Sequence, residues 1–289
     1  MNRYGFFKHR CVPAVFSAVL AASLFVAGCD IYGNRGGISA DDSMAGMPLI
    51  EMELPEGPLE GKVRESYSTS VNTVILGRSV KGRAISMVVF GGENRPSVFI
   101  FGGIHGEEKT AAATAENLIE YLRKHPEFYS SRRVAVLPRA NPDGLAVGRR
   151  FNEHGVDLNR NFPAHNFRTS DKHGTHPASE PETRAIIKAM NLLDPNRIIS
   201  IHSCKRGRHG NNWDGPAWEI ARSMSKHNHY SEFGTWHNAT PGSFGNWAGV
   251  DRKIPVVTLE LPNDLSASRC WSDNRDAILE FIKSAPTGK

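Results

Sequence analysis

The sequence has little of what marks several large classes of protein. It contains no apolar run of the roughly 20 residues that a membrane-spanning helix requires, so a multi-pass membrane protein is not indicated. Neither sign of charge dominates, because 35 basic residues stand against 30 acidic ones, and this balance does not suggest nucleic-acid binding. Internal repeats are lacking as well. Charged residues make up 22% and hydrophobic residues 39% of the 289 positions, which is typical of a globular protein and not of a disordered chain.

The N-terminus has the parts of an export signal. Arg3, Lys8 and Arg10 form a cationic start, residues 12–26 form an apolar segment, and small residues precede Cys29. A membrane-spanning helix is the alternative interpretation, but the apolar segment is shorter than the roughly 20 residues such a helix needs. We therefore expect residues 1–28 to be removed, which leaves 32 basic residues against 30 acidic ones.

The residues around Cys29 resemble a lipoprotein processing site. The sequence Val-Ala-Gly-Cys at 26–29 resembles the bacterial lipobox, which implies lipidation of the Cys29 thiol. Asp30 beside it resembles the signal that retains some lipoproteins at the inner membrane of diderm bacteria. We expect an exported protein anchored by lipid to the periplasmic face of the inner membrane, with simple secretion as the alternative.

Local patterns divide the mature chain into a tether and one domain. Residues 29–66 are rich in glycine, proline and acids and show little periodicity, so we expect a flexible tether before a domain at 67–289. Strands are expected at 85–90, 98–101, 134–137, 197–201 and 256–261, and helices at 111–125, 181–193, 217–226 and 273–284. This alternation predicts an α/β fold with a mixed, mostly parallel central sheet flanked by helices.

Two short motifs predict how elements begin or turn. Asn141-Pro142-Asp143-Gly144 is typical of a tight loop. Ser179 followed by Glu182 is typical of a capping box at the start of the helix expected at 181–193.

The strand expected at 98–101 leads to the first candidate metal ligands. His105 and Glu108 follow it after two glycines, and an H-x-x-E spacing lets an imidazole and a carboxylate converge on one Zn²⁺. The C-terminal ends of strands are also where open α/β sheets keep their ligand sites. The spacing alone is weak evidence, because His229 and Glu232 have it too.

Two other expected strand ends carry matching groups. His202 ends one strand, and together with His105 and Glu108 it makes the three-ligand set that a catalytic zinc uses, with the fourth position left to water. Glu260 lies in the apolar run VVTLELP, where burial would raise its pKa and suit it to take a proton from water. A glutamate facing solvent at the sheet edge is the alternative interpretation of Glu260.

Residues 155–162, GVDLNRNF, lie between these groups. Strand-like alternation would put Asp157, Asn159 and Asn161 on one side, and an aspartate commonly holds the second nitrogen of a ligating histidine. Arg160 and the preceding Arg150 offer forked donors for a substrate carboxylate or an oxyanion, unless they are plain surface arginines.

The order of these motifs resembles the zinc carboxypeptidase family. H-x-x-E, N-P-D-G, R-x-N-x-x-G-V-D-L-N-R-N-F, a later strand ending in histidine, and T-L-E-L follow one another between residues 77 and 262. The resemblance implies a zinc carboxypeptidase-like fold and one Zn²⁺ per chain held by His105, Glu108 and His202. It also implies that Glu260 is the general base and acid, and that Asp157 supports His105.

The same resemblance implies how a substrate is held. It makes Arg150 the stabiliser of the oxyanion, and Asn159 with Arg160 the clamp for the terminal carboxylate. Within the family the chain looks most like murein peptide amidases, which share R-x-N at 150–152, residues 155–163, SEPET at 179–183 and TPGSFG at 240–245.

The resemblance implies hydrolysis of an amide in peptidoglycan stem peptides, at the bond between D-glutamate and meso-diaminopimelate. A carboxypeptidase of ordinary peptides and a deacylase of N-acyl amino acids are the enzymatic alternatives. A lipoprotein that binds wall peptides without cleaving them is a fourth possibility, disfavoured because all three ligands and the base are present. Peptidoglycan-derived peptides are the expected partners, with the membrane reached through the lipid.

Two finer expectations concern the surroundings of the site. In the family the strands before Cys204 and Cys270 are neighbours, so we expect these two cysteines to form a disulfide in the oxidising compartment. The segment before Glu260 is expected to form the pocket wall, with Phe244, Trp247 and the substrate-binding Asn246. Further candidates for the distal carboxylate of diaminopimelate are Arg206, Arg208 and His209.

Overall fold

One mixed sheet of eight strands organises the part of the chain that the computed structural model describes, residues 69–93, 96–234 and 240–284. From edge to edge the strands follow the order β1-β2-β4-β3-β5-β8-β6-β7. Their bounds are Val71–Arg78 (β1), Ala84–Phe90 (β2), Ser97–Gly102 (β3), Arg133–Leu137 (β4), Arg197–Cys204 (β5), Gly210–Asp214 (β6), Glu232–Phe233 (β7) and Val256–Pro262 (β8). The expected signal peptide, the tether and the boundary at residue 67 lie outside the described residues.

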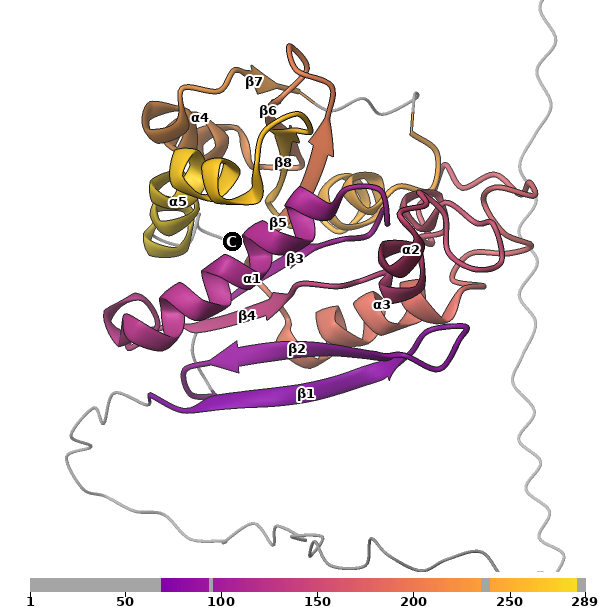
Figure 1. Ribbon diagram of the computed structural model, residues 1–289, viewed down its shortest axis with the longest axis horizontal. Helices are drawn as coiled ribbons and strands as arrows, with labels where there is room; N and C mark the ends of the chain where they lie inside the picture. The colour runs from indigo at the N-terminus through magenta and orange to yellow at the C-terminus, as the bar shows by residue number, and fades with distance from the viewer. Residues whose placement is uncertain (1–68, 94–95, 235–239, 285–289) are drawn as a thin grey trace, which may run out of the picture. The chain divides into compact units, whose positions relative to one another are not determined.

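The central strands of the sheet are parallel. β4, β3, β5 and β8 pair with one another in parallel, whereas β1 and β2 on one side and β6 on the other join the sheet through antiparallel pairings (Figure 1). The expected α/β class with a mixed, mostly parallel sheet is confirmed. In this register His202 of β5 lies opposite Glu260 of β8, so two candidate site residues are direct neighbours across the pair.

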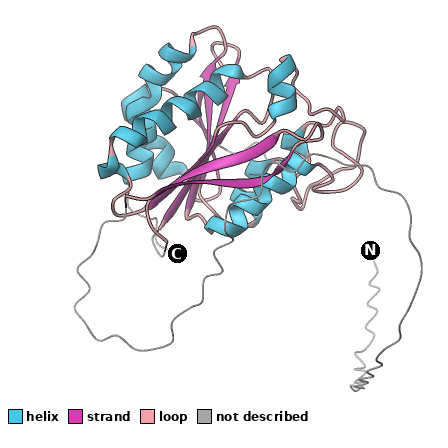
Figure 2. Ribbon diagram, turned by 60° about the horizontal axis from the view of Figure 1, so that its bottom comes forward, coloured by secondary structure: helices cyan, strands magenta, loops and turns pink. Residues whose placement is uncertain are grey.

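Helices cover both faces of the sheet (Figure 2). The helices α1 (Lys109–Lys124), α4 (Trp218–Asn228) and α5 (Ala267–Lys283) enclose one apolar core. On the other face α3 (Pro181–Leu193) and the π-helical turn η3 (Gly245–Asp251) enclose a second core. No helix within the described ranges is long and apolar enough to cross a membrane.

The strand β3 lies at the middle of both cores. Its alternating side chains divide between them, with Val98 and Ile100 in the first core and Phe99 and Phe101 in the second. All four side chains are at most 1% exposed, and fully burying each such side chain contributes about 1.5–3 kcal/mol. A strand buried on both faces has the continuous apolar run seen in the sequence, and it gives the residues that follow a rigid support.

Two expected local structures differ in the folded chain. Residues Asn141 to Gly144 do not form a loop but begin the short helix α2 (Pro142–Val147), because the Asn141 side chain accepts a hydrogen bond from Gly144 N at 2.9 Å. The helix α5 begins at Ala267 instead of residue 273, because Ser266 Oγ caps it by accepting from Arg269 N at 3.2 Å.

The expected capping box at α3 does not form. Glu180 takes the N-cap position, and Ser179 Oγ donates to Glu180 Oε1 at 2.8 Å instead of capping the helix. Glu182 cannot reach back because the amide of Asn152 donates to both Glu180 Oε2 at 2.7 Å and Glu182 Oε2 at 3.0 Å. These bonds tie the start of α3 to the loop that carries Arg150.

Candidate metal centre and substrate cavity

The loop after β3 brings His105 against a second loop. A Cβ atom on Gly106 would lie 2.0 Å from the carbonyl carbon of Gly144, so only glycine allows the two backbones to approach this closely. Gly106 N also donates to the carbonyl of Arg150 at 3.3 Å. This close approach explains why Arg150, distant in sequence, lies beside His105.

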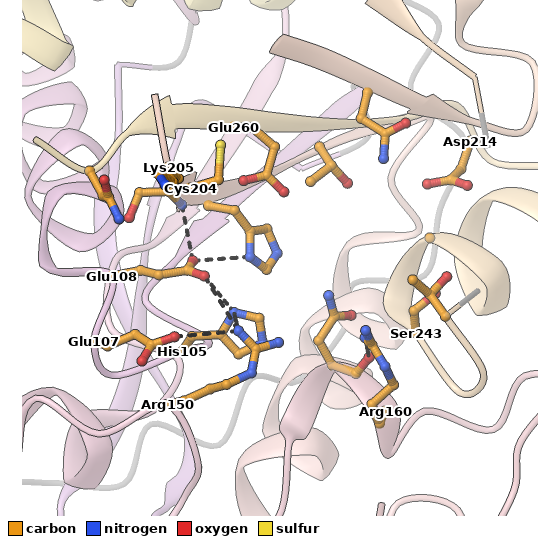
Figure 3. A pocket seen from close by; sticks show the side chains of 18 residues that line it. His105, Glu107, Glu108, Arg150, Arg160, Cys204, Lys205, Asp214, Ser243 and Glu260 are labelled. Atoms are coloured by element: carbon orange, nitrogen blue, oxygen red, sulfur yellow. Dashed lines mark hydrogen bonds and ion pairs between the residues drawn. The ribbon is translucent and has the colours of Figure 1, made fainter. Parts of the chain in front are cut away.

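Three buried side chains from two strand ends converge. Glu108 Oε1 lies 2.7 Å from His105 Nδ1, and its other oxygen, Oε2, lies 3.1 Å from His202 Nδ1 (Figure 3). The candidate ligand atoms all lie within 4.8 Å of one another. Ser203 N donates to Glu108 Oε2 at 3.1 Å and fixes the carboxylate between the two imidazoles.

In the absence of a metal ion, a proton on His105 offsets the negative charges of the nearby carboxylates. Burial lowers the pKa of His105, but the carboxylates of Glu108 and Asp157 outweigh it and raise that pKa to about 9. Burial raises the pKa of Glu108, but His202 and His105 hold it well below its usual range. Metal-binding side chains bind in their deprotonated form, so a divalent cation at this position would replace the proton on His105.

The donor set fits zinc. Two imidazole nitrogens and one carboxylate are ligands of a catalytic zinc with an open fourth position. His105, Glu108 and His202 are 3%, 6% and 3% exposed, so all three donors are buried side chains. The three side chains that the sequence singled out lie together, and their geometry can hold one metal ion.

Asp157 connects the cluster to Arg150. Its Oδ1 lies 3.1 Å from His105 Nε2, while Oδ2 accepts from Arg150 Nε at 3.0 Å and Nη2 at 2.9 Å. These donors, led by His105, hold the pKa of Asp157 well below its usual range although burial opposes them. The third guanidinium nitrogen of Arg150, Nη1, lies 3.4 Å from His105 Nδ1 and therefore faces the cluster.

Glu260 lines the cavity next to His202. Burial raises the pKa of Glu260, His202 opposes this rise and the nearby carboxylate of Glu108 adds to it. The Cys204 side chain hydrogen-bonds to Glu260, and burial together with that carboxylate raises the pKa of the thiol to about 12. Glu260 is therefore a partly buried carboxylate poised to bind a proton, as the sequence predicted.

Asn159 and Arg160 lie in a 3₁₀ turn, Leu158–Arg160, and not in an alternating strand. Asp157 and Asn161 consequently point to different partners: Asn161 Nδ2 donates to the carbonyl of His173 at 2.7 Å, away from His105. The side chain of Asn159 accepts from Phe244 N at 2.8 Å, which joins the turn to the wall of the cavity. Asn159 and Arg160 both line that cavity.

The cavity has a volume of about 400 Å³ and contains the metal cluster in one wall. Its lining combines residues that the sequence singled out with others that it did not. The expected residues are His105, Glu108, Arg150, Asn159, Arg160, His202, Cys204 and Glu260, and those that sequence reasoning missed include Glu107, Lys205, Asn212, Asp214, Thr240, Ser243 and Thr258.

Asn246 does not line the cavity, so the structure does not place it where its predicted substrate-binding role requires. It is 1% exposed, and its amide donates to the carbonyl of Thr240 at 2.8 Å and to Ser243 Oγ at 2.9 Å. The π-helical turn points this side chain inward, behind the wall. The expected wall residues Phe244 and Trp247 likewise belong to the apolar core.

The predicted disulfide is also wrong, because Cys204 and Cys270 are free thiols. Cys204 points into the cavity beside Glu260, whereas Cys270 is buried in the core under α5 and contacts the carbonyl of Pro262 at 3.6 Å. The two side chains face different surroundings, although Cys204 ends β5 and Cys270 follows β8, the strand that pairs with β5.

The three basic residues that the sequence named as candidates for the distal carboxylate do not line the cavity that contains His105, Glu108 and His202. Arg206 pairs with Asp264 at 2.7 Å on the surface, and the ring of His209 stacks edge-on against Tyr230. Arg208 lines a neighbouring cavity that shares Asn212 and Glu260 with the first one. A polar strand, β6, follows these residues, and it supplies two of the cavity residues that the sequence did not reveal, Asn212 and Asp214.

Comparison with known proteins agrees with this geometry. A family model described as zinc carboxypeptidase matches residues 60–208. Murein peptide amidase A of Escherichia coli strain K12 is 31% identical over 208 residues, covering 64% of this chain and 79% of that protein.

Solved structures share the fold. Carboxypeptidase A from Helicoverpa armigera superposes with a TM-score of 0.66 at 20% identity, covering 74% of this chain and 68% of that one. A murein-tripeptide amidase from Escherichia coli O157 superposes with a TM-score of 0.57 at 24% identity, covering 79% of this chain and 98% of that one.

Proposed function

The chain belongs to the zinc carboxypeptidase family and is a metallopeptidase, and from this premise we propose that it hydrolyses stem peptides of peptidoglycan. The bond we assign is the amide between the γ-carboxyl of D-glutamate and meso-diaminopimelate. The observation that carries the hydrolytic assignment is the His105, Glu108 and His202 cluster with Glu260 opposite His202 in the sheet.

His105, Glu108 and His202 would hold a single zinc ion per chain. When bound, zinc polarises the substrate carbonyl and makes a water molecule more acidic. Glu260 takes the proton of the attacking water at its carboxylate, since burial raises its pKa. The same carboxyl then gives the proton to the leaving amine, which completes hydrolysis.

Arg150 stabilises the charge that develops on the carbonyl oxygen. Asp157 engages two of its three guanidinium nitrogens, and Nη1 remains directed toward the cluster. A donor held in place before the reaction costs no reorganisation in the transition state. Asn159 and Arg160 hold the terminal carboxylate of the substrate, a role supported by their place in the cavity lining.

The substrate assignment has two supports. The relative of 31% identity is a murein peptide amidase, and the amino-terminal sequence has the features of an exported lipoprotein. We propose that the lipid on Cys29 anchors the enzyme at the periplasmic face of the inner membrane, close to the cell wall.

One assay tests the function. Purified zinc-loaded protein is incubated with L-Ala-γ-D-Glu-meso-diaminopimelate, with peptides ending in Phe or Leu, and with N-acyl amino acids, and products are identified by mass spectrometry. Release of free meso-diaminopimelate at the highest kcat/KM supports the proposal. Faster cleavage of the plain peptides would instead identify a general carboxypeptidase, and faster cleavage of acyl amino acids a deacylase.

A separate measurement tests the anchor. Cells expressing the protein are labelled with a palmitate analogue, and Cys29→Ser is the matched variant. Label on the native protein alone, together with its loss from the membrane fraction in the variant, is the expected result. Equal membrane association without label would contradict lipidation.

A further inference from the structure

Among the described residues, three lysine and arginine side chains line the cavity, and the proposed function uses only two of them. Arg150 faces the developing oxyanion and Arg160 holds the terminal carboxylate, whereas Lys205 has no part in either task. Lys205 follows directly after β5. Figure 3 shows it on the same side of the cavity as Glu107, across from Asp214 on the far wall, which β6 and the η3 turn form.

The ammonium group of Lys205 is available to a ligand. Within the described part of the chain it forms no ion pair and no side-chain hydrogen bond, although the next residue, Arg206, binds Asp264 at 2.7 Å. A lysine ammonium has three donors and no acceptor, so an anionic oxygen is the partner that suits it. The cavity therefore holds one cation that the protein itself leaves unpaired.

Backbone contacts hold Lys205 close to the base. Its carbonyl accepts from Arg208 N at 3.1 Å, and the carbonyl of the preceding Cys204 accepts from Asn263 N at 2.8 Å. The side chain of Cys204 hydrogen-bonds to Glu260. Asn263 follows β8 and lines the same cavity, so its amide adds a second donor on this side.

The proposed substrate carries a carboxylate that these donors would meet. Because D-glutamate is linked through its γ-carboxyl, its α-carboxylate stays free and is joined to the scissile carbonyl by a short carbon chain. An ordinary α-linked peptide has an amide in that place. On this side of the cavity the α-carboxylate approaches Glu107, Glu108 and Glu260, and like charges repel. Binding of this group therefore requires a cation here.

We propose that Lys205, together with the amide of Asn263, binds the α-carboxylate of the D-glutamate residue. This inference rests on the proposed function and makes it more specific, because it assigns recognition of the γ-linkage to the acyl side of the scissile bond. Arg160 then holds the leaving residue and Lys205 holds the acyl residue, so the amide lies between two cations beside the metal cluster. Arg208, which lines the neighbouring cavity, is the competing candidate.

Three tripeptides isolate the contribution of the α-carboxylate. The first is L-Ala-γ-D-Glu-meso-diaminopimelate, the second contains D-isoglutamine, in which that carboxylate is an amide, and the third contains γ-aminobutyrate, which lacks it. Lys205 is exposed, and charge pairs that water reaches are weaker than buried ones. We expect the zinc-loaded native protein to cleave the first with a kcat/KM about five- to tenfold higher than either analogue. Raising the ionic strength should reduce this ratio.

Lys205→Gln is the decisive variant, because it removes the charge and keeps most of the side chain. The ratio of the first tripeptide to each analogue should fall to within about twofold of one. Both rates are measured on one preparation, so a partly unfolded sample does not change the ratio. Lys205→Arg keeps the charge and should retain most of the preference. Arg206→Gln removes the neighbouring cation and is the matched control, which should keep the native ratio.

Three outcomes overturn the inference. The first is a ratio near one in the native protein, and the second is an unchanged ratio in Lys205→Gln. The third is a ratio that Arg208→Gln abolishes and Lys205→Gln does not, because the carboxylate would then bind in the neighbouring cavity.

Failure of the proposed function gives a different result. If the zinc-loaded native protein cleaves none of the tripeptides, the murein assignment fails. Calorimetric titration with the dipeptides L-Ala-γ-D-Glu and L-Ala-D-isoglutamine then tests the subsite. Tighter binding of the first dipeptide that Lys205→Gln abolishes upholds the subsite. Equal binding of the two dipeptides, or binding of neither, refutes it.

Discussion

Replacing Asp157 with asparagine tests whether the metal cluster and Arg150 depend on one carboxylate. Four N–H groups surround the Asp157 side chain: His105 Nε2 and Asn159 N lie 3.1 and 3.0 Å from Oδ1, and Arg150 Nε and Nη2 lie 3.0 and 2.9 Å from Oδ2. An asparagine offers only one oxygen, so its NH₂ group must face donors on one of the two sides.

Asp157→Asn should weaken both zinc binding and catalysis, because Asp157 contacts both His105 and Arg150. Losing the carboxylate behind a ligating histidine weakens metal binding by about 10- to 100-fold. Removing one oxyanion donor outright costs about 10²–10³ in kcat. Arg150 remains in Asp157→Asn but loses its charged partner, so we expect kcat/KM at saturating zinc to fall by about 10- to 100-fold, below the cost of removing the arginine.

Zinc affinity is measured by competition with a chromophoric chelator, which requires no assumption about the substrate. The turnover of the murein tripeptide is then followed at saturating zinc. Asp171→Asn, an exposed aspartate on the same long loop, is the matched control and should change neither quantity. Native zinc affinity in Asp157→Asn would refute the reasoning, because the His105 contact would then contribute nothing to ligand strength.

Three further outcomes are expected. Glu260→Gln should keep the native zinc content, measured by atomic emission, and lose about 10²–10⁴ in kcat, since the amide cannot take a proton; near-native turnover would remove Glu260 from the mechanism. Metal-free protein should lose thermal stability as the pH rises from about 6.5 to about 9, because the raised pKa of His105 stabilises the fold only while the imidazole is protonated; a flat melting profile over this range contradicts that balance. Thiol titration of the unreduced, denatured domain, prepared without Cys11 and Cys29, should find two free sulfhydryls, those of Cys204 and Cys270. If no free sulfhydryl is found, the two cysteines form a disulfide after all.

The candidate zinc ligands and Glu260 were predictable because they lie at or just after the ends of buried apolar strands. His105, His202 and Glu260 stand at or near the ends of β3, β5 and β8, and parallel strands bring their carboxyl ends to one edge of a sheet. The strands themselves show as short apolar runs in the sequence. Pattern and topology therefore point to the same place, and the resemblance to the zinc carboxypeptidase family supplied the role of each residue.

The side of the cavity formed by β6 and the η3 turn was not predictable, because the sequence of neither element shows a clear periodic pattern. The strand β6 reads Gly-Asn-Asn-Trp-Asp, which has no apolar run, and only its pairing with β8 makes it a strand. Asn246 looked suitable because it is polar and precedes Glu260, but the direction of a side chain on a π-helical turn depends on the packing of η3. The disulfide prediction failed for a similar reason, since the pairing of two strands does not determine the direction of the cysteine side chains at or beyond their ends.

The pairing of β5 with β8 fixes the distance between His202 and Glu260 independently of the rest of the cavity lining. His202 and Glu260 are partners across one pair of strands, so the spacing of their backbones is the interstrand distance of about 4.8 Å. Backbone hydrogen bonds, which substitutions other than proline leave in place, maintain that spacing. The far wall depends instead on side chains of β6 and on the glycines of η3. Changes there can retune which residue is accepted while the hydrolytic centre keeps its dimensions, and redesign of selectivity should begin at that wall.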